Sequence, residues 1–283
     1  MQNIRYISFL PGGNKTALVI GDGYDSVQRK VINDAIMKQD PQMEQVGFVK
    51  PAGDHSLTDP NCAPSLQMAG GEFCGNATRS AAYYYLCGRS GELVMTVSGG
   101  RKVSCGVYEN GEAWCEIPLA ETGIRQMENM APGIIKVNLS GITHLVIEPE
   151  TAVQFLKEAG PSQNPEALKK AGLSLIEEYG LKELEAAGAI FLEQISEDKF
   201  RIHPIVRVRD IDSLFYETAC GSGTTAAAMV IGRKTSEILQ PSGMTIRAEL
   251  TSSENTSDTS GPFIRAVISG PVESSMTPET ISI

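Results

Sequence analysis

The chain carries the same short pattern twice, once in each half. Residues 72–82 read Glu-Phe-Cys-Gly-Asn-Ala-Thr-Arg-Ser-Ala-Ala, and residues 218–228 read Thr-Ala-Cys-Gly-Ser-Gly-Thr-Thr-Ala-Ala-Ala. Counted from the cysteine, both copies follow Cys-Gly-x-small-Thr-x-small-Ala-Ala. A pattern that returns after about half the chain indicates a duplicated architecture. We therefore expect two similar halves, with Cys74 and Cys220 at equivalent positions.

Each copy of the pattern is expected to begin a helix. Residues 77–86 and 224–231 contain neither Gly nor Pro and are rich in small or helix-forming side chains. A cysteine at a helix start faces unpaired backbone N–H groups and the positive end of the helix dipole. This placement predicts a lowered thiol pKa and a more accessible thiolate. The same N–H groups form an anion site suited to a carboxylate, which Gly75 and Gly221 leave open.

The elements around the two motifs follow the same order in both halves, which predicts an α+β protein of two similar lobes. A helix of about fourteen residues is expected after Asp25, with Val27, Val31, Ile32, Ala35 and Ile36 as its apolar stripe. Further helices are expected around 152–159 and 165–179. Strands are expected at 6–10, 16–20, 45–49, 93–98, 102–108, 113–117, 134–139, 143–147, 189–194, 200–208, 244–250 and 263–268. The pattern loosens near 118–132, which places the lobes at 1–128 and 129–271.

Two thiols at helix starts suit a reaction at a carbon next to a carboxylate. Removing an amino acid's α-proton requires stabilisation of the charge that develops, and two helix N-termini aimed at the carboxylate would supply it. A thiolate on one face of the carbon could take a proton while a thiol on the other face delivers one. The product is the mirror configuration. This scheme requires no pyridoxal phosphate, nicotinamide or metal cofactor.

Other interpretations of the cysteines stay open at this point. A buried cysteine is more often a small core residue than a catalyst, and Cys62, Cys87, Cys105 and Cys115 are interpreted in that way because they lack the motif. None of the cysteines has zinc-ligand spacing, so no metal site is expected. His144 lies in a strand-like stretch, and we prefer to interpret it as a hydrogen-bonded core residue and not as an acid or base. A thiol redox or regulatory protein and a non-catalytic amino acid binder are the alternatives to an enzyme.

The composition limits the partners. The formal net charge of −10 over 283 residues argues against nucleic acid binding, because no basic stripe could neutralise phosphates. No apolar run approaches the roughly 20 residues that span a bilayer, and the first residues do not resemble a secretory signal. We therefore expect a cytoplasmic protein without a membrane role. The sequence leaves open whether it forms a homodimer.

The two motifs resemble those of the diaminopimelate epimerase-like superfamily. Further segments agree with this resemblance: Gly13-Asn14, Gln45 before Val46-Gly47-Phe48, Gln240-Pro241-Ser242-Gly243 and Ser269-Gly270-Pro271. The resemblance implies two lobes, each a β-barrel-like sheet around a central helix, with the site between them and residues 272–283 returning to the first lobe. It also implies cofactor-independent racemisation or epimerisation with Cys74 and Cys220 as the two bases. The implied substrate-binding residues are Asn14, Gln45, Gln67, Gly75, Asn76, Glu217, Gly221 and Ser222.

The approach to the second cysteine bears on the substrate. Diaminopimelate epimerases carry a longer segment there, with an Arg that holds the distal end of the substrate. Here the segment is only residues 215–219, without Arg, and Arg207 and Arg209 lie on a predicted strand. The first motif and the stretch 44–48 look closer to cofactor-independent histidine racemases. Histidine is therefore the first expected substrate, and diaminopimelate or another amino acid is the alternative.

Overall fold

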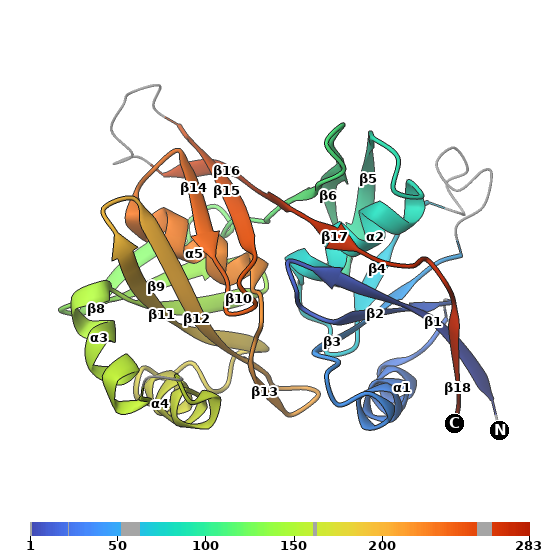
Figure 1. The fold of residues 1–283 in the computed structure, drawn as a ribbon, viewed down its shortest axis with the longest axis horizontal. Helices are drawn as coiled ribbons and strands as arrows, with labels where there is room; N and C mark the ends of the chain where they lie inside the picture. The colour runs from blue at the N-terminus through green and yellow to red at the C-terminus, as the bar shows by residue number, and fades with distance from the viewer. Residues whose placement is uncertain (1, 22, 52–62, 161–162, 254–261) are drawn as a thin grey trace. The chain divides into compact units, whose positions relative to one another are not determined.

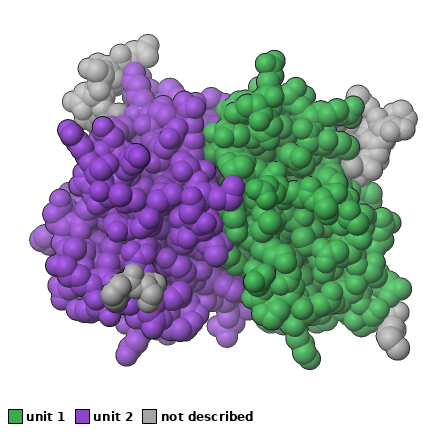
Figure 2. Space-filling model, in the orientation of Figure 1, with its two compact units in different colours: residues 1–116, 269–283 green, residues 117–268 purple. Residues whose placement is uncertain are grey.

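The chain folds as an α+β protein in which helices pack on large β-sheets. The computed structural model describes residues 2–21, 23–51, 63–160, 163–253 and 262–283. It divides into two compact units: unit 1 holds residues 1–116 and 269–283, and unit 2 holds residues 117–268 (Figure 2). Residues 128 and 129, the expected lobe boundary, lie inside a strand of unit 2. In the described part of the chain, no helix is long and apolar enough to cross a membrane.

Unit 1 is built from strands that pair mostly with sequence neighbours (Figure 1). Its elements are β1 (Asn3–Pro11), β2 (Thr16–Ile20), α1 (Ser26–Gln39), β3 (Gln45–Val49), β4 (Leu66–Met68), α2 (Gly75–Tyr85), β5 (Gly91–Val97), β6 (Arg101–Val107), β7 (Ala113–Glu116), β17 (Val272–Glu273) and β18 (Glu279–Ser282). One sheet has the order β17-β1-β2-β3-β4, and β18 also pairs with β1. Strands β5, β6 and β7 pair antiparallel in succession. The chain's first and last strands thus belong to the same unit.

Helix α1 begins where the sequence predicts, at a capping box. The backbone N–H of Gln28 donates to Asp25 Oδ1 at 2.8 Å, and the N–H of Asp25 donates to Gln28 Oε1 at 3.0 Å. The predicted apolar stripe is partly wrong, because Val27 and Val31 are 70% and 52% exposed. The buried residues of α1 are Ile32, Asn33 and Ile36. Only a narrow face of the helix is therefore covered.

Helix α2 is the central element of unit 1. It contacts strands β1 to β7, and Tyr83 alone among its residues is not buried. The small side chains of the motif allow this close packing, because strands can approach Ala and Ser on every side of the helix. Among the described residues the strands do not close into a barrel, so the barrel-like lobe stays a prediction.

Unit 2 is a single sheet with helices on it. Its elements are β8 (Met127–Ala131), β9 (Ile134–Leu139), β10 (Ile142–Ile147), α3 (Pro149–Glu158), α4 (Pro165–Glu178), β11 (Ala186–Ser196), β12 (Lys199–Val208), β13 (Ser213–Tyr216), α5 (Gly221–Ile231), β14 (Thr235–Leu239), β15 (Thr245–Ser252) and β16 (Phe263–Gly270), the last of which ends in unit 1. The strand order is β16-β15-β14-β12-β11-β10-β9-β8, with β13 paired to β12.

Strand alternation sorts the residues of unit 2 onto two faces. Leu145, Ala189 and Phe191 join the hydrophobic core that also contains residues of α3 and α4. Their neighbours His144 and Ile190 point the opposite way, because successive side chains of a strand alternate between faces. His144 contacts the start of α5, and Ile190 lies close to Gly223 in the first turn of that helix. The sheet therefore carries α3 and α4 on one face and the motif helix α5 on the other.

Candidate active site

Cys74 is the N-cap of α2, as the sequence predicts. Its backbone is extended, with φ −129° and ψ 115°, and its Sγ accepts from the N–H of Ala77 at 3.4 Å. The Thr78 hydroxyl donates to the Cys74 carbonyl at 2.7 Å. Cys74 is 9% exposed. The thiol is therefore held at the helix start by groups within its own motif.

Cys220 occupies the equivalent position at the start of α5. Its φ is −132° and its ψ is 110°, and its Sγ accepts from the N–H of Gly223 at 3.3 Å. The Thr224 hydroxyl donates to the Cys220 carbonyl at 2.7 Å. The repeated Thr, four residues after each cysteine, thus fixes both caps in the same way. The duplication seen in the sequence extends to backbone angles and hydrogen bonds.

A polar chain in unit 1 joins two of the predicted binding residues to Cys74. Asn14 donates to Glu44 Oε2 at 2.7 Å, and the Thr16 hydroxyl lies 2.9 Å from Asn14 Oδ1 and 3.3 Å from Gln45 Oε1. Gln45 Oε1 in turn lies 3.0 Å from Cys74 Sγ. Asn14 and Thr16 are fully buried. The sequence pattern does not identify Thr16, whose only signal is its place in the strand after Asn14.

The remaining predicted residues of unit 1 lie on α2 and β4. Gly75 and Asn76 form the first turn of α2, and Asn76 Oδ1 accepts from Arg79 at 3.0 Å. Gln67 lies on β4 opposite Phe48 of β3 and is partly exposed. The structure thus links Asn14 and Gln45 to Cys74 by hydrogen bonds, and Asn76 to Arg79.

Unit 2 holds its cysteine through a residue from a later strand connection. Gln240 Oε1 accepts from the Cys220 N–H at 3.0 Å, and Gln240 Nε2 donates to Thr224 Oγ1 and to the Ile238 carbonyl, both at 3.0 Å. Gln240 is fully buried. The family resemblance includes the segment that begins at Gln240, but no local sequence pattern predicts the contact with Cys220.

Ser222 connects Cys220 to a buried histidine. The Ser222 hydroxyl lies 3.6 Å from Cys220 Sγ and 2.9 Å from His144 Nε2. His144 is fully buried, and burial lowers its pKa to about 3, so its ring is neutral. Gly188 makes room for the ring, since a Cβ there would lie 2.3 Å from His144 Nδ1. His144 is therefore buried, as the core interpretation predicts, but its hydrogen-bond partner, Ser222, is a predicted site residue.

The prediction of a lowered thiol pKa is wrong for Cys220. Burial raises the pKa of this thiol well above its ordinary value, and the carboxylate of Glu217 raises it further. The Ser222 hydroxyl and the Gly223 N–H oppose this shift but do not reverse it. Glu217, a predicted binding residue, is itself buried and faces Cys220. Cys220 is therefore a protonated thiol at neutral pH in the free protein.

The other cysteines follow the core interpretation only in part. Cys105 and Cys115 are buried, and burial raises the pKa of each thiol, that of Cys105 to about 12. Cys87 is exposed, which corrects the prediction: it follows α2 with a φ of 52°, in the left-handed region where the helix ends. Cys62 lies outside the described residues. None of the five described cysteines forms a disulfide bond.

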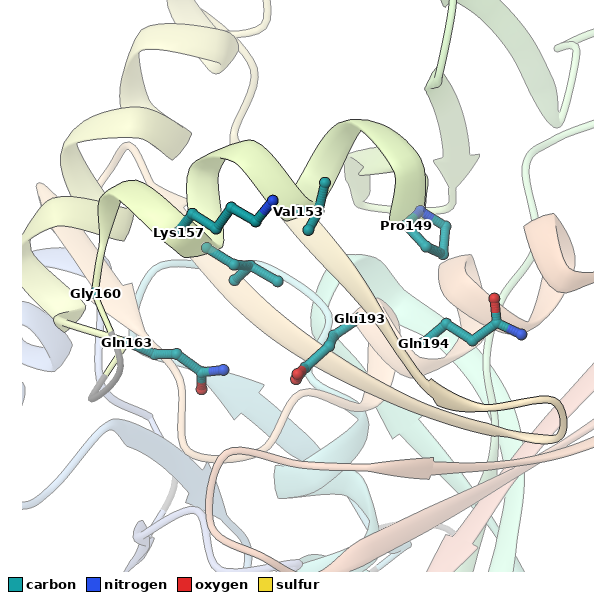
Figure 3. A pocket seen from close by; sticks show the side chains of 8 residues that line it. Pro149, Val153, Lys157, Gly160, Gln163, Glu193 and Gln194 are labelled. Atoms are coloured by element: carbon teal, nitrogen blue, oxygen red, sulfur yellow. The ribbon is translucent and has the colours of Figure 1, made fainter.

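Of the hollows in unit 2, one lies near α3 and another near the second motif. The first, of about 490 Å³, lies between α3 and β11, where Lys157 and Glu193 face it (Figure 3). None of the predicted site residues lines it. The second, of about 630 Å³, borders the approach to Cys220 and is lined by Phe215, Tyr216 and Thr218 among others. Among the described residues, no group of three or more His, Cys, Asp or Glu side chains could hold a metal ion.

The arginines near the second motif are held elsewhere. Arg207 donates to the Lys182 carbonyl, and Arg209 donates to the Glu183 carbonyl and to Asp210. The segment between β13 and Cys220 contains no arginine. Backbone carbonyls and Asp210 therefore hold Arg207 and Arg209, whereas Arg201 lines the hollow that borders the approach to Cys220.

Solved structures of racemases and epimerases share this fold. A hydroxyproline epimerase from Agrobacterium vitis superposes with a TM-score of 0.62 at 11% identity, covering 99% of this chain and 91% of that chain. A probable proline racemase from Agrobacterium radiobacter K84 gives a TM-score of 0.63 at 11% identity, covering 99% and 93%. These likenesses establish the fold, which this chain shares with both structures.

The family follows from sequence. The family model described as the N-terminal domain of the histidine racemase CntK matches residues 3–260, so the chain belongs to this family. A histidine racemase from Fusobacterium nucleatum is 27% identical over 266 residues, which are 86% of this chain and 88% of that protein. A histidine racemase from Staphylococcus aureus is 25% identical over 238 residues, which are 80% and 78%. The predicted resemblance and the assignment to the isomerases are confirmed.

Proposed function

We propose that the protein racemises a free amino acid at its α-carbon, using Cys74 and Cys220 as the two bases and no cofactor. The observation that carries this proposal is the identical capping geometry of the two thiols, each of which accepts the backbone N–H three residues further on. Nothing in helix capping requires cysteine, since Ser, Thr, Asp and Asn cap better. A pair of cysteines at matched caps therefore points to chemistry that uses sulfur.

The proposed reaction assigns separate tasks to the thiols and the helix starts. One sulfur, as thiolate, removes the α-proton, and the other, as thiol, donates a proton to the opposite face of the carbon. The first backbone N–H groups of α2 and α5, at Gly75, Asn76, Gly221 and Ser222, bind the carboxylate and stabilise the negative charge that develops on it. Asn14, Gln67 and Glu217 complete the proposed substrate contacts, and Gln45 supports Cys74.

Histidine is the substrate we propose first. The matching family model describes a histidine racemase domain, and the two relatives named above are histidine racemases. The absence of an arginine between β13 and Cys220 supports a substrate without a second carboxylate. Diaminopimelate is the alternative, and it would require another cation to bind its distal carboxylate.

The test is hydrogen exchange at the α-carbon. Reduced protein is incubated in D2O with L-histidine or D-histidine without added cofactor, and deuterium uptake and optical rotation are followed. Exchange with loss of rotation is expected for wild type and for Cys87→Ser, an exposed control. Cys74→Ser and Cys220→Ser should each lose racemisation. Absence of exchange for histidine, diaminopimelate and the other common amino acids would refute the proposal, and activity retained in either motif variant would refute its two-base form.

A further inference from the structure

The two motif helices differ in charge at one position. Five residues after the cysteine, α2 carries Arg79 and α5 carries Thr225. The Thr225 hydroxyl donates to the Gly221 carbonyl of its own helix at 3.1 Å, so that position is neutral. Arg79 is fully buried and is among the largest fully buried side chains of the protein. The duplicated site is therefore electrostatically unequal.

Arg79 has an unusual environment for a buried cation. Its guanidinium donates to Asn76 Oδ1 at 3.0 Å and to the Gly270 carbonyl at 3.1 Å, and both acceptors are neutral. Its Nε is buried and makes no hydrogen bond, and no described carboxylate forms an ion pair with it. Burying an ion without a partner costs several kcal/mol. A nearby group that becomes anionic would offset this cost.

Three ionisable groups act on the guanidinium: Cys115 of β7, Cys74 of α2 and Glu112, which precedes β7. Cys115 is fully buried and its thiol stays protonated, because burial raises its pKa strongly. Cys105 lies on β6, the strand that pairs with β7, and burial keeps its thiol neutral as well. Glu112 is partly exposed, so solvent screens its charge.

Cys74 is the remaining candidate for the anion. Its Sγ accepts a backbone N–H from Ala77 at the positive end of α2. The Gln45 amide beside it can present its oxygen to a thiol or its NH2 group to a thiolate. Glu44, the carboxylate of the same polar chain, is bonded to Asn14. These surroundings suit a sulfur that gains and loses a proton.

Cys220 has the opposite surroundings. The charged group that acts on it most strongly is the carboxylate of Glu217, which raises the pKa of the thiol. Its other partners are the neutral Ser222 hydroxyl and the Gly223 N–H. A negative charge on Cys220 would therefore be repelled, whereas a negative charge on Cys74 would be attracted.

On the basis of the proposed function, we propose that Arg79 is a positioning residue that sets the resting protonation states, with Cys74 as thiolate base and Cys220 as thiol acid. In the first turnover the α-proton moves to Cys74 Sγ, its electron pair stays on the substrate carbon, and the Cys220 proton is added to the opposite face. The enzyme is left with a Cys74 thiol and a Cys220 thiolate. Exchange of both protons with solvent restores the resting state.

The test needs no substrate. Iodoacetamide alkylation of each cysteine is followed by peptide mass spectrometry as a function of pH, and the pH midpoints are compared, because the midpoint does not depend on access to the sulfur. In wild type the Cys74 midpoint should lie below that of Cys220. In Arg79→Met the Cys74 midpoint should rise by about one unit, which slows alkylation near neutral pH about tenfold, and Arg79→Lys should restore most of the effect.

The controls separate charge from structure. Thr225→Val, at the matched position of α5, and Cys115→Ala should leave the Cys74 midpoint unchanged. A wild-type Cys74 midpoint at or above that of Cys220 would overturn the proposal without any variant. So would a folded Arg79→Met protein with the wild-type midpoint, or a Cys115→Ala shift as large as that of Arg79→Met. Failure of racemisation with an intact midpoint difference would count against the proposed function alone.

Discussion

The Nε2 atom of His144 lies 2.9 Å from the Ser222 hydroxyl, which itself lies 3.6 Å from Cys220 Sγ. The other ring nitrogen, Nδ1, is buried and makes no hydrogen bond. A buried N–H without an acceptor is rarer than a buried acceptor without a donor. The neutral ring therefore carries its proton on Nε2 and donates to Ser222, which leaves the hydroxyl proton of Ser222 free to point at the sulfur or the substrate.

Replacing His144 should impair catalysis through Ser222. In His144→Leu the hydroxyl loses its donor and can turn away, so we expect kcat/KM to fall about tenfold, the equivalent of about 1.4 kcal/mol. His144→Gln can still donate to Ser222 and should recover much of the loss. Racemisation kinetics of both variants and of Ser222→Ala provide the measurement. Equal activity of His144→Leu and wild type would contradict the assigned role.

The same histidine should make the protein sensitive to acid. The native pKa of His144 is about 3, below the ordinary 6.5, so between these values the unfolded chain binds a proton that the native protein does not. Stability should therefore fall as pH drops below about 6.5, by about 1.4 kcal/mol per pH unit from this group. Urea unfolding at several pH values measures the slope, and His144→Gln should show a shallower one. Parallel slopes for the two proteins would contradict the prediction.

Gly188→Ala should be destabilising because of the His144 ring. The new Cβ would lie 2.3 Å from Nδ1 and 2.7 Å from Cε1, with the Ile205 carbonyl at 3.1 Å on the other side. Such overpacking costs about 1–3 kcal/mol. The double variant His144→Ala/Gly188→Ala should lose less than the two single changes together, because the collision is removed. Additive losses in denaturant unfolding would show that the ring is not the obstacle.

Gln240→Leu should weaken both the fold and the site. The change removes the acceptor of the Cys220 N–H and the donor to Thr224 and Ile238, all of which are buried groups. We expect a loss of about 3 kcal/mol in unfolding free energy and lower racemase activity. Gln240→Glu keeps the acceptor for Cys220 but loses the donor, so it separates the two contributions. An unchanged unfolding midpoint for Gln240→Leu would contradict the prediction.

The sequence predicted the elements whose signals are local. The two Cys-Gly motifs, the Asp25 cap and the strands of both halves all depend on patterns within a few residues, and they appear near the expected positions. It did not predict which face of α1 is covered, because Val27 and Ile36 are equally apolar and only the packing partner distinguishes them.

The missing parts of the candidate site depend on pairing between distant strands. His144 reaches Ser222 because β10 presents that face to α5, and Gln240 reaches Cys220 from the connection between β14 and β15. Neither contact has a sequence spacing that identifies it. The sequence pattern also does not predict the short strands β4, β8, β13, β14, β17 and β18, since two to five residues give too few alternations to recognise.

Both chain ends lie in unit 1, where β18 pairs with β1 and β17 pairs with the end of β1 (Figure 1). Unit 2 is therefore inserted into unit 1 along the chain. During synthesis on the ribosome, every residue of unit 2 emerges before the edge partners of β1 exist. The unit that begins first is completed last, and a nascent chain halted after residue 268 would carry a whole second unit beside an unfinished first one.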